Sequence, residues 1–372
     1  MIGVDARLNA YRTGGIATYT RELLRGLSKR LRSEALTVIE HRRAQKPTCA
    51  HFTSRRAWTP PHHRLERLTL SLEIMPHRFK LFHSPDFIPP AFGAERFIIT
   101  VHDLTFLHYP ETLTPESRRY YNDQITWAVR RADHILTVSQ CSRRDLVERL
   151  NVPIEKITVT YEGAHERFRP LPPEEVDQVL HTLGLTRGYL LHVGTWEPRK
   201  NLDRLAAAYR QVAATLPQTP PLLLVGQPGW HFERVRARIE ALKIPADRLI
   251  WRSDIDDDAL PAVYNGAHCT VTPSLYEGFG LPVLEGMACG CPPLVSNRSA
   301  LPEIVGEVGA LFDPDNVEDI ADKLLYALTA TGWREAQQKA ALERAKLFSW
   351  DACAAQTLDI YQRYAARPIM TL

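Results

Sequence analysis

Two glutamates stand eight positions apart in the stretch LYEGFGLPVLEG, on either side of a glycine-and-proline turn. Pro282 suits the first turn of a helix, where its missing N–H costs nothing, so we expect a helix from about Pro282 to Cys289. A helix N-terminus offers free N–H groups and about half a positive charge to a phosphate. Glu277 would stay in the loop and Glu285 would lie about one turn into the helix, so the two carboxylates would bracket a bound anion.

Carboxylates on either side of a phosphate can accept hydrogen bonds from hydroxyl groups, one set on a ribose and one on a sugar. The glutamate pair therefore suggests the two ends of a nucleotide-sugar. Cations for its diphosphate are available in GTWEPRKN, where Arg199 and Lys200 follow an apolar run. In the first part of the chain, His102 follows another apolar run and Gly14-Gly15 forms a weaker signal, both at positions expected to face a cleft.

The chain that must position these residues alternates short apolar runs with amphipathic stretches, which is typical of parallel sheets with crossover helices. Its 372 residues exceed what one hydrophobic core usually organises, so two α/β domains are expected. A polar stretch with three prolines, residues 162–175, interrupts the alternation and predicts a hinge linker. The apolar runs that we interpret as strands are FIITV (97–101), HILTVS (134–139), YLLHVG (189–194), LLLVG (222–226), LIW (249–251) and TVTPS (270–274).

Helix signals follow these runs. Apolar residues between Ile16 and Leu31 recur on one helical face, which predicts an amphipathic helix there. Thr114-Pro115 and Asn201 stand directly before helical periods, so we expect them to act as N-caps.

Composition places the chain among globular proteins, with 44% hydrophobic and 24% charged residues. No apolar segment approaches the roughly 18 residues of a membrane span, and the opening MIGVDARL lacks the features of a secretory signal. We therefore expect a cytoplasmic protein, at most peripherally bound to the inner face of the cell membrane. Six scattered cysteines predict reduced, buried thiols, and the close pair Cys289 and Cys291 lacks the further ligands that a metal site needs.

Charge is uneven along the chain. Residues 1–90 carry 16 Lys or Arg against seven Asp or Glu, although the whole chain totals only +3. Within this basic part, Leu65, Leu68, Leu72 and Met75 share one helical face near arginines, which indicates either a segment that binds anionic lipid or an ordinary core helix. Nucleic acid is not expected as a partner, because no nucleic-acid-binding motif accompanies the basic residues.

Several segments, taken in order, resemble the retaining glycosyltransferases of family 4. That family has the α/β fold called GT-B, in which two Rossmann-like domains face each other across a central cleft. The resemblance implies an acceptor-side domain at residues 1–168, a nucleotide-sugar-binding domain at 169–348, and a helix at about 349–372 that packs back on the first domain. The segments that carry it are GGIATYTRELL (14–24), VHDLTFLHYPE (101–111), TVSQCSRRDL (137–146), VGTWEPRKNL (193–202), LYEGFGLPVLEGMACGCPPLVSNRSALPEIVG (275–306) and FSWDACAAQTLDIY (348–361).

The resemblance also implies roles for individual residues. Glu277 would contact the transferred sugar, Glu285 the ribose, Arg199 and Lys200 the diphosphate, and His102 the donor sugar near the reacting carbon. Some family members carry a basic residue where this chain has Thr195, so Arg199 would do more of the phosphate binding. The implied catalytic residues are His102, Glu277, Lys200 and Arg199, and the implied donor-binding residues are Gly14, Gly15, Gly194, Arg199, Lys200, Ile255, Glu277, Gly278, Phe279, Gly280, Leu281, Val283 and Glu285.

The stretch HDLTFLHYPE (102–111) resembles the branch of the family that contains bacterial mannosyltransferases of polysaccharide and O-antigen assembly. The expected enzyme therefore transfers a hexose with retained stereochemistry, with GDP-mannose as the leading donor, to a saccharide or a lipid-linked oligosaccharide. UDP-glucose, UDP-GlcNAc or GDP-rhamnose fit the same pocket chemistry. No cofactor and no metal are expected, and the acidic stretch DIDDDAL (254–260) is interpreted as a helix start. The alternative from another class is a nucleotide-sugar-binding protein without turnover. The oligomeric state is open.

Overall fold

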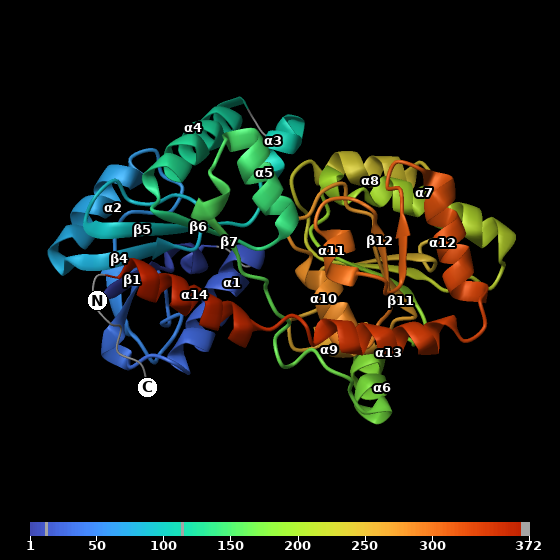
Figure 1. The fold of residues 1–372 in the computed structure, drawn as a ribbon. Coiled ribbons are helices and arrows are strands. Elements are labelled where there is room, and N and C mark those ends of the chain that lie inside the picture. Colours follow the sequence, from blue (N-terminus) through green and yellow to red (C-terminus); the bar gives the residue numbers. More distant parts are fainter. Residues whose placement is uncertain (12–13, 113–114, 366–372) are drawn as a thin grey trace. The chain divides into compact units, whose positions relative to one another are not determined.

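The computed structural model describes the chain except for residues 12–13, 113–114 and 366–372 (Figure 1). The expected N-cap at Thr114 and the last residues of the expected C-terminal helix thus lie outside the described residues. The chain divides into unit 1, formed by Met1–Gly163 and Ser349–Leu372, and unit 2, formed by Ala164–Phe348.

Unit 1 is built on a seven-stranded sheet in which all neighbouring strands are parallel. Its strands are β1 (Ile2–Asp5), β2 (Leu36–His41), β3 (Thr53–Ala57), β4 (Phe79–Ser84), β5 (Ala94–Val101), β6 (His134–Thr137) and β7 (Ile157–Val159). The order across the sheet is β3-β2-β1-β4-β5-β6-β7. The direction of the order reverses between β1 and β4, which makes this the topological switch point of unit 1.

Helices cover both faces of this sheet. One face packs on α2 (Glu66–Ile74), α4 (Pro115–Arg131) and α5 (Gln140–Leu150). The other face packs on α1 (Gly15–Ser28) and α14 (Trp350–Tyr364), which lie against each other. Gly26 permits this contact, since a Cβ there would lie 2.5 Å from the Cβ of Ala354. The last helix of the chain is therefore part of the core of unit 1.

Unit 2 repeats this arrangement with a six-stranded parallel sheet of order β10-β9-β8-β11-β12-β13. Its strands are β8 (Leu190–Val193), β9 (Leu222–Val225), β10 (Leu249–Arg252), β11 (Cys269–Thr272), β12 (Pro293–Ser296) and β13 (Ala310–Phe312). The switch point lies between β8 and β11. Both sheets follow the strand order of doubly wound Rossmann folds, as the alternation in the sequence predicted.

The faces of the second sheet are also covered by helices. One core packs β8, β9 and β11 on α7 (Leu202–Thr215), α8 (Phe232–Glu240) and α12 (Val317–Thr329). The opposite core includes residues of α6 (Pro173–Thr182), α9 (Leu260–Gly266) and the end of α10 (Leu281–Ala288), and α13 (Trp333–Ala345) packs on α10. Strands that are buried on both faces consist of continuous apolar residues. They could therefore be predicted from the sequence.

All six runs interpreted as strands are strands in the structure, and the amphipathic segment after Gly14 forms α1. The helix expected from about Pro282 begins one residue earlier, at Leu281. The expected linker at 162–175 overlaps the boundary between the units, but its last residues belong to α6, which begins at Pro173.

One expected cap is wrong in its chemistry. Asn201 occupies the N-cap position of α7, but its side chain makes no capping hydrogen bond and its backbone is left-handed, with φ 58°. Its Nδ2 instead donates to the carbonyls of Pro273, at 3.1 Å, and Pro314, at 2.7 Å. A buried amide with two backbone acceptors is better satisfied there than at the helix end.

Helix α2, in the basic part of unit 1, presents its apolar stripe to solvent. Leu65, Leu68, Leu72 and Met75 are each more than half exposed, whereas Leu70 on α2 is buried in the core. The interpretation of this stripe as part of the core is therefore wrong, because the residues between the stripe positions make the core contacts.

Candidate functional site

The loops that follow β8 and β11 meet at the switch point of unit 2, where ligands of doubly wound sheets bind. Arg199 and Lys200 lie in a short 3-10 helix, η6 (Pro198–Lys200), after β8. Glu277 lies in the loop after β11. The N–H of Leu275 donates to the carbonyl of Arg199 at 2.9 Å, which ties the two loops together. Residues 76 positions apart in the sequence are thus neighbours.

These three charged side chains form one ion cluster. Lys200 Nζ donates to Glu277 Oε1 at 2.6 Å, and Arg199 Nη1 donates to Glu277 Oε2 at 3.0 Å. The same Arg199 also donates to Glu197 Oε1 at 2.7 Å and to the carbonyl of Tyr276 at 2.6 Å. The side chains are largely but not fully buried, at 9% exposure for Lys200 and 17% for Arg199. Both cations thus have a fixed position and a small accessible surface.

The electrostatics of the cluster keep Glu277 ionised. Burial by itself raises the pKa of this carboxyl, but the charges of Lys200 and Arg199 and the hydrogen bonds to it outweigh burial and lower the pKa to about 2. Its backbone N–H donates to Ser299 Oγ at 2.9 Å, which fixes the loop. A permanently charged carboxylate in this position can accept hydrogen bonds from sugar hydroxyls.

The N-terminus of α10 lies directly after Glu277. Gly280 occupies the N-cap with φ 109°, a conformation that L side chains rarely adopt, and a Cβ there would lie 2.8 Å from Leu301 Cδ2. Glycine is therefore required for this turn. Phe279 and Gly278 are buried in the same turn, and Leu281 begins the helix. The backbone thus takes the form expected for an anion site, and the anion itself stays a prediction.

The second glutamate lies on α10, one turn after its start. Tyr264 donates its hydroxyl to Glu285 Oε2 at 3.2 Å, and Glu285 is partly exposed while Val283, two residues earlier, is buried. Ile255, the expected nucleobase contact, is partly buried and packs against the core that contains Tyr264. Glu285 and Ile255 are therefore both accessible on unit 2. Their contacts with the ribose and the nucleobase stay predictions.

One residue at this switch point was not identified from the sequence. His192 stands in β8 within the run YLLHVG, and its side chain is buried. Gly194 is another expected donor-binding residue of unit 2. An added Cβ on it would lie 3.4 Å from His192 Nε2 and 3.7 Å from Lys200 Nζ. The sequence signal was a single polar residue inside an apolar strand, placed two residues before a glycine.

The expected residues of unit 1 lie at the start of α1 and the end of β5. Gly14 is the N-cap of α1 with φ 133°, and both Gly14 and Gly15 are exposed. His102 follows β5, and the ring of Tyr19 on α1 meets its ring edge-on, with centroids 4.7 Å apart. These residues thus share one region of unit 1.

Both ring nitrogens of His102 face oxygen acceptors. Nε2 lies 2.9 Å from the carbonyl of Pro85, and Nδ1 lies 3.4 Å from Glu162 Oε1. Burial by itself lowers the pKa of His102, but the hydrogen bond and charge of Glu162, the Pro85 carbonyl and the charge of Asp86 raise it overall. His102 therefore has an acceptor at each ring nitrogen and a pKa above the ordinary value of histidine.

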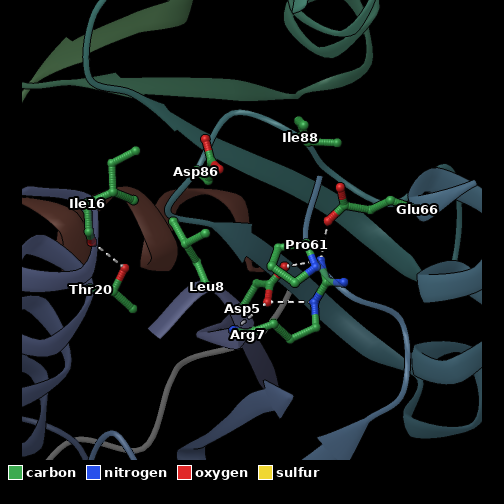
Figure 2. Close-up of a pocket in the computed structure, with 9 residues that line it drawn as sticks. All are labelled: Asp5, Arg7, Leu8, Ile16, Thr20, Pro61, Glu66, Asp86 and Ile88. Carbon is green, nitrogen blue, oxygen red and sulfur yellow. Dashed lines mark hydrogen bonds and ion pairs between the residues drawn. The ribbon is translucent and has the colours of Figure 1, made fainter. Parts of the chain in front are cut away.

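A pocket opens at the switch point of unit 1 (Figure 2). Arg7 is 1% exposed and lies between Asp5, at 2.7 Å, and Glu66, at 2.5 Å. Asp86, which follows β4, lies across the pocket from them and pairs with His62. The pocket is lined by Asp5, Arg7, Leu8, Ile16, Thr20, Pro61, Glu66, Asp86 and Ile88. Its lining therefore combines carboxylates with aliphatic side chains.

Within the described residues, no group of three or more His, Cys, Asp or Glu side chains is arranged to hold a metal ion. The acidic stretch before α9 has other contacts. Asp254 pairs with Arg252 and Asp257 with Arg167, and Asp256 Oδ1 accepts from the N–H of Ala259 just before the helix. The carboxylates of this stretch thus bind arginines and a helix start.

Comparison with known proteins matches both parts of the chain to glycosyltransferase families. Residues 13–167 match the model described as Glycosyltransferase Family 4, and residues 177–344 match the model described as Glycosyl transferases group 1. The first match contains Gly14, Gly15 and His102, and the second contains every expected site residue of unit 2.

Individual relatives agree with the family models. The O-antigen chain mannosyltransferase B of Escherichia coli is 35% identical over 76% of this chain and 74% of its own length. The serotype-specific mannosyltransferase WbdA of Escherichia coli is 31% identical over 72% of this chain, which spans only 33% of that protein. The solved structure of a sucrose-phosphate synthase from Thermosynechococcus elongatus aligns with a TM-score of 0.77, at 21% identity, over 97% of this chain and 98% of its own. None of the described helices is both long and apolar enough to span a membrane.

Proposed function

The chain belongs to glycosyltransferase family 4 and has the GT-B fold, and from this premise we propose that it transfers mannose from GDP-mannose, with retained stereochemistry, to a saccharide or lipid-linked acceptor. That the chain is a glycosyltransferase follows from its family. The donor, the acceptor and the stereochemistry are the proposed parts. Two mannosyltransferases among its relatives support mannose as the transferred sugar.

The ion cluster at the switch point of unit 2 carries the proposal. Two fixed cations and the start of a helix lie beside a carboxylate, which is what a nucleoside diphosphate joined to a sugar requires. Arg199, Lys200 and the N–H groups from Phe279 to Leu281 would bind the diphosphate. Glu277 would hold hydroxyls of the sugar.

The proposed chemistry is electrostatic. The bond between the sugar C1 and the diphosphate oxygen breaks, and the cations stabilise the negative charge that develops on the departing diphosphate. The acceptor hydroxyl then attacks C1 from the face that the diphosphate leaves, and its proton passes to the departing diphosphate oxygen. Glu277 is held by two cations, so it serves as a hydroxyl acceptor and not as a nucleophile.

We also propose that the reaction needs no metal, since Arg199 and Lys200 supply the positive charge that a metal would supply elsewhere. Incubation with EDTA followed by a transfer assay tests this. Full activity is the expected result. Loss of activity that Mg²⁺ or Mn²⁺ restores would contradict it.

We propose that the pocket of unit 1 receives at most a hydroxyl group, because it is too small for a sugar ring. The carboxylates in its lining can accept a hydrogen bond from such a group (Figure 2). The cation Arg7 is already bound to two carboxylates, so a phosphorylated acceptor group is not expected in this pocket.

A panel of nucleotide-sugars tests the donor. Thermal shift with GDP-mannose, GDP-rhamnose, UDP-glucose and UDP-GlcNAc is expected to give its largest stabilisation with GDP-mannose, since a ligand at 100 times its dissociation constant adds about 2.7 kcal/mol. NMR of the product should show the same anomeric configuration as the donor. A larger thermal shift with a UDP-sugar would contradict GDP-mannose as the donor. An inverted linkage in the product would contradict the retaining mechanism.

A lipid-linked acceptor would place the enzyme at a membrane surface, and the stripe on α2 supports such contact. Trp58, 68% exposed, lies beside this stripe, since its backbone N–H donates to Glu73 Oε2 on α2 at 2.6 Å. The guanidinium of Arg42 stacks over the Trp58 ring at 4.3 Å. Exposed apolar side chains beside arginines suit anionic lipid headgroups.

Co-sedimentation with vesicles tests this contact. Vesicles that contain phosphatidylglycerol should bind the protein, and vesicles of phosphatidylcholine alone should not. The double variant Leu68→Ser and Leu72→Ser should lose the binding, whereas Leu347→Ser, at a leucine of unit 2 that is more exposed than either, should keep it. Equal binding by both variants would reject this surface.

A further inference from the structure

His192 presents a hydrogen-bond acceptor at the switch point of unit 2. Its side chain is 1% exposed, and its Nδ1 lies 2.9 Å from the carbonyl oxygen of Val271 on the neighbouring strand β11. A carbonyl only accepts hydrogen bonds, so Nδ1 carries the proton in this contact. The pKa of His192 is lowered to about 4, chiefly because the ring is buried, so the ring is neutral at pH 7 and Nε2 holds a lone pair.

Nε2 is buried, and within the described part of the chain no group forms a hydrogen bond with it. Buried polar atoms of native proteins nearly always have a partner, which is protein, water or ligand. The other ring nitrogen fixes the orientation of the imidazole, so Nε2 cannot reach Val271 instead. A hydrogen-bond donor from outside the protein is therefore expected at Nε2.

The space next to Nε2 is bounded by an ammonium group. At Gly194, which is partly exposed, a Cβ would lie 3.4 Å from His192 Nε2, 3.6 Å from Lys200 Cε and 3.7 Å from Lys200 Nζ. These are ordinary van der Waals distances, so the position that a side chain would occupy is open. An atom of a ligand placed there would have an acceptor on one side and a donor on the other.

We propose that His192 Nε2 accepts a hydrogen bond from a hydroxyl group of the bound nucleotide-sugar, with Lys200 Nζ donating to the same hydroxyl oxygen. A hydroxyl group both donates and accepts, so it satisfies the two protein groups at once. An ionised diphosphate oxygen has no proton to donate and would face the lone pair of Nε2. The inference rests on the proposed function, because it needs a nucleotide-sugar at this switch point. It assigns His192 as a ligand-binding residue.

The hydroxyl can come from the hexose or from the ribose, and matched ligands separate the two. Dissociation constants are measured by calorimetry for GDP-mannose, its monodeoxymannose analogues, GDP, and 2′-deoxy- and 3′-deoxy-GDP. The wild-type protein is compared with His192→Phe, which removes the acceptor but keeps a ring. Loss of one buried hydrogen bond is expected to weaken binding about tenfold.

If the hydroxyl belongs to the hexose, His192→Phe weakens GDP-mannose about tenfold and leaves GDP unchanged. The variant then has the same affinity for GDP-mannose and for the one deoxymannose analogue that lacks this hydroxyl. If the hydroxyl belongs to the ribose, His192→Phe weakens the binding of GDP and of GDP-mannose equally. The variant then binds GDP and the one deoxy-GDP that lacks this hydroxyl with the same affinity. His192→Gln, which retains an acceptor, should recover part of the affinity.

The matched control is His134→Phe, at a histidine of unit 1 that is equally buried but has partners for both nitrogens, Thr158 and Tyr364. It should leave donor affinity unchanged. The inference is overturned if His192→Phe binds GDP-mannose as wild type does, or if every deoxy analogue loses the same affinity in both proteins. If a variant does not fold, the affinities of the wild-type protein for the deoxy analogues still test whether one ligand hydroxyl contributes the expected hydrogen bond. If wild-type protein binds no nucleotide-sugar at all, the proposed function fails instead.

Discussion

At the switch point of unit 1 a single cation, Arg7, lies between the carboxylates of Asp5 and Glu66, whereas at the switch point of unit 2 two cations share Glu277. The two sheets have the same strand order up to the sixth strand, so the loops occupy equivalent places. Arg7 is 1% exposed, and its guanidinium also donates to the carbonyl of Thr59 at 2.8 Å. The unit 1 cluster is thus closed and acidic.

The unit 2 cluster differs in both respects. Its cations retain some accessible surface, and the N-terminus of α10 adds positive potential beside them. The same fold thus holds a closed, acidic cluster in unit 1 and, in unit 2, a cluster that we propose binds the diphosphate. The difference predicts that loss of the cation in unit 1 lowers stability most, whereas loss of a cation in unit 2 chiefly lowers catalysis.

The largest effect is expected for Arg7→Met, which leaves two buried carboxylates without their cation. Removal of one partner of a buried ion pair costs about 3–5 kcal/mol of unfolding free energy. Urea titration measures the loss. Adding Glu66→Gln to Arg7→Met should recover part of it, because one of the uncompensated charges is then gone.

Arg199→Met is the matched substitution in unit 2. It should cost less stability, because Lys200 stays bound to Glu277. Equal losses for Arg7→Met and Arg199→Met would mean that the two clusters do not differ as described.

Acid should weaken the unit 2 cluster through Glu277. Its folded-state pKa of about 2 lies below the ordinary value of 4.5, so its ionised form stabilises the fold above pH 4.5 and this stabilisation is lost as the pH falls toward 2. The full contribution is about 3 kcal/mol, of which about 2 kcal/mol should disappear between pH 5 and pH 3.

The unfolding free energies of wild type and Glu277→Gln, measured across this pH range, check the prediction. The wild-type curve should fall more steeply than the curve of the variant. Parallel curves would show that Lys200 and Arg199 do not hold Glu277 in its ionised form.

The sequence predicted the strands of unit 2 and the start of α10 because both have local causes. Strands buried on two faces must be apolar, and the Gly-Phe-Gly-Leu-Pro turn admits few conformations. The contact of Arg199 and Lys200 with Glu277 has no local cause. It depends on β8 and β11 being neighbours, and residues between them in the sequence form β9 and β10 on the other side of β8.

His192 and Asn201 are residues whose side-chain partners could not be predicted from the local sequence. The side chain of His192 lies among apolar strand residues, so its free acceptor is visible only once Val271 is placed beside it. Asn201 has the residue type of an N-cap, but tertiary contacts to the carbonyls of Pro273 and Pro314 take its side chain away from the helix. Side-chain partners across strands therefore limited the prediction more than secondary structure did.

Catalysis distinguishes the two units most directly through Lys200. Lys200→Ala should lower turnover at least ~10²-fold, about 2.7 kcal/mol, because the diphosphate loses one of its two cations in the transition state. Steady-state transfer assays at saturating donor measure the effect. Asp257→Ala is the control, since this carboxylate is 76% exposed and pairs only weakly with Arg167, at 3.4 Å. Near-normal turnover of Lys200→Ala would show that the diphosphate binds elsewhere.

The smallest effect is expected for Gly194→Ala, which fills the space between His192 Nε2 and Lys200 Nζ. Its backbone, at φ 156°, makes alanine strained, at a cost of about 1 kcal/mol of unfolding free energy. Gly184→Ala has a comparable cost, since Gly184 has φ 67° and open space around its Cβ position. Only the change at Gly194 should also weaken donor binding severalfold, by excluding the ligand hydroxyl from the methyl-sized space. Equal donor affinity in the two variants, measured by calorimetry, would show that the space beside Lys200 does not receive the donor.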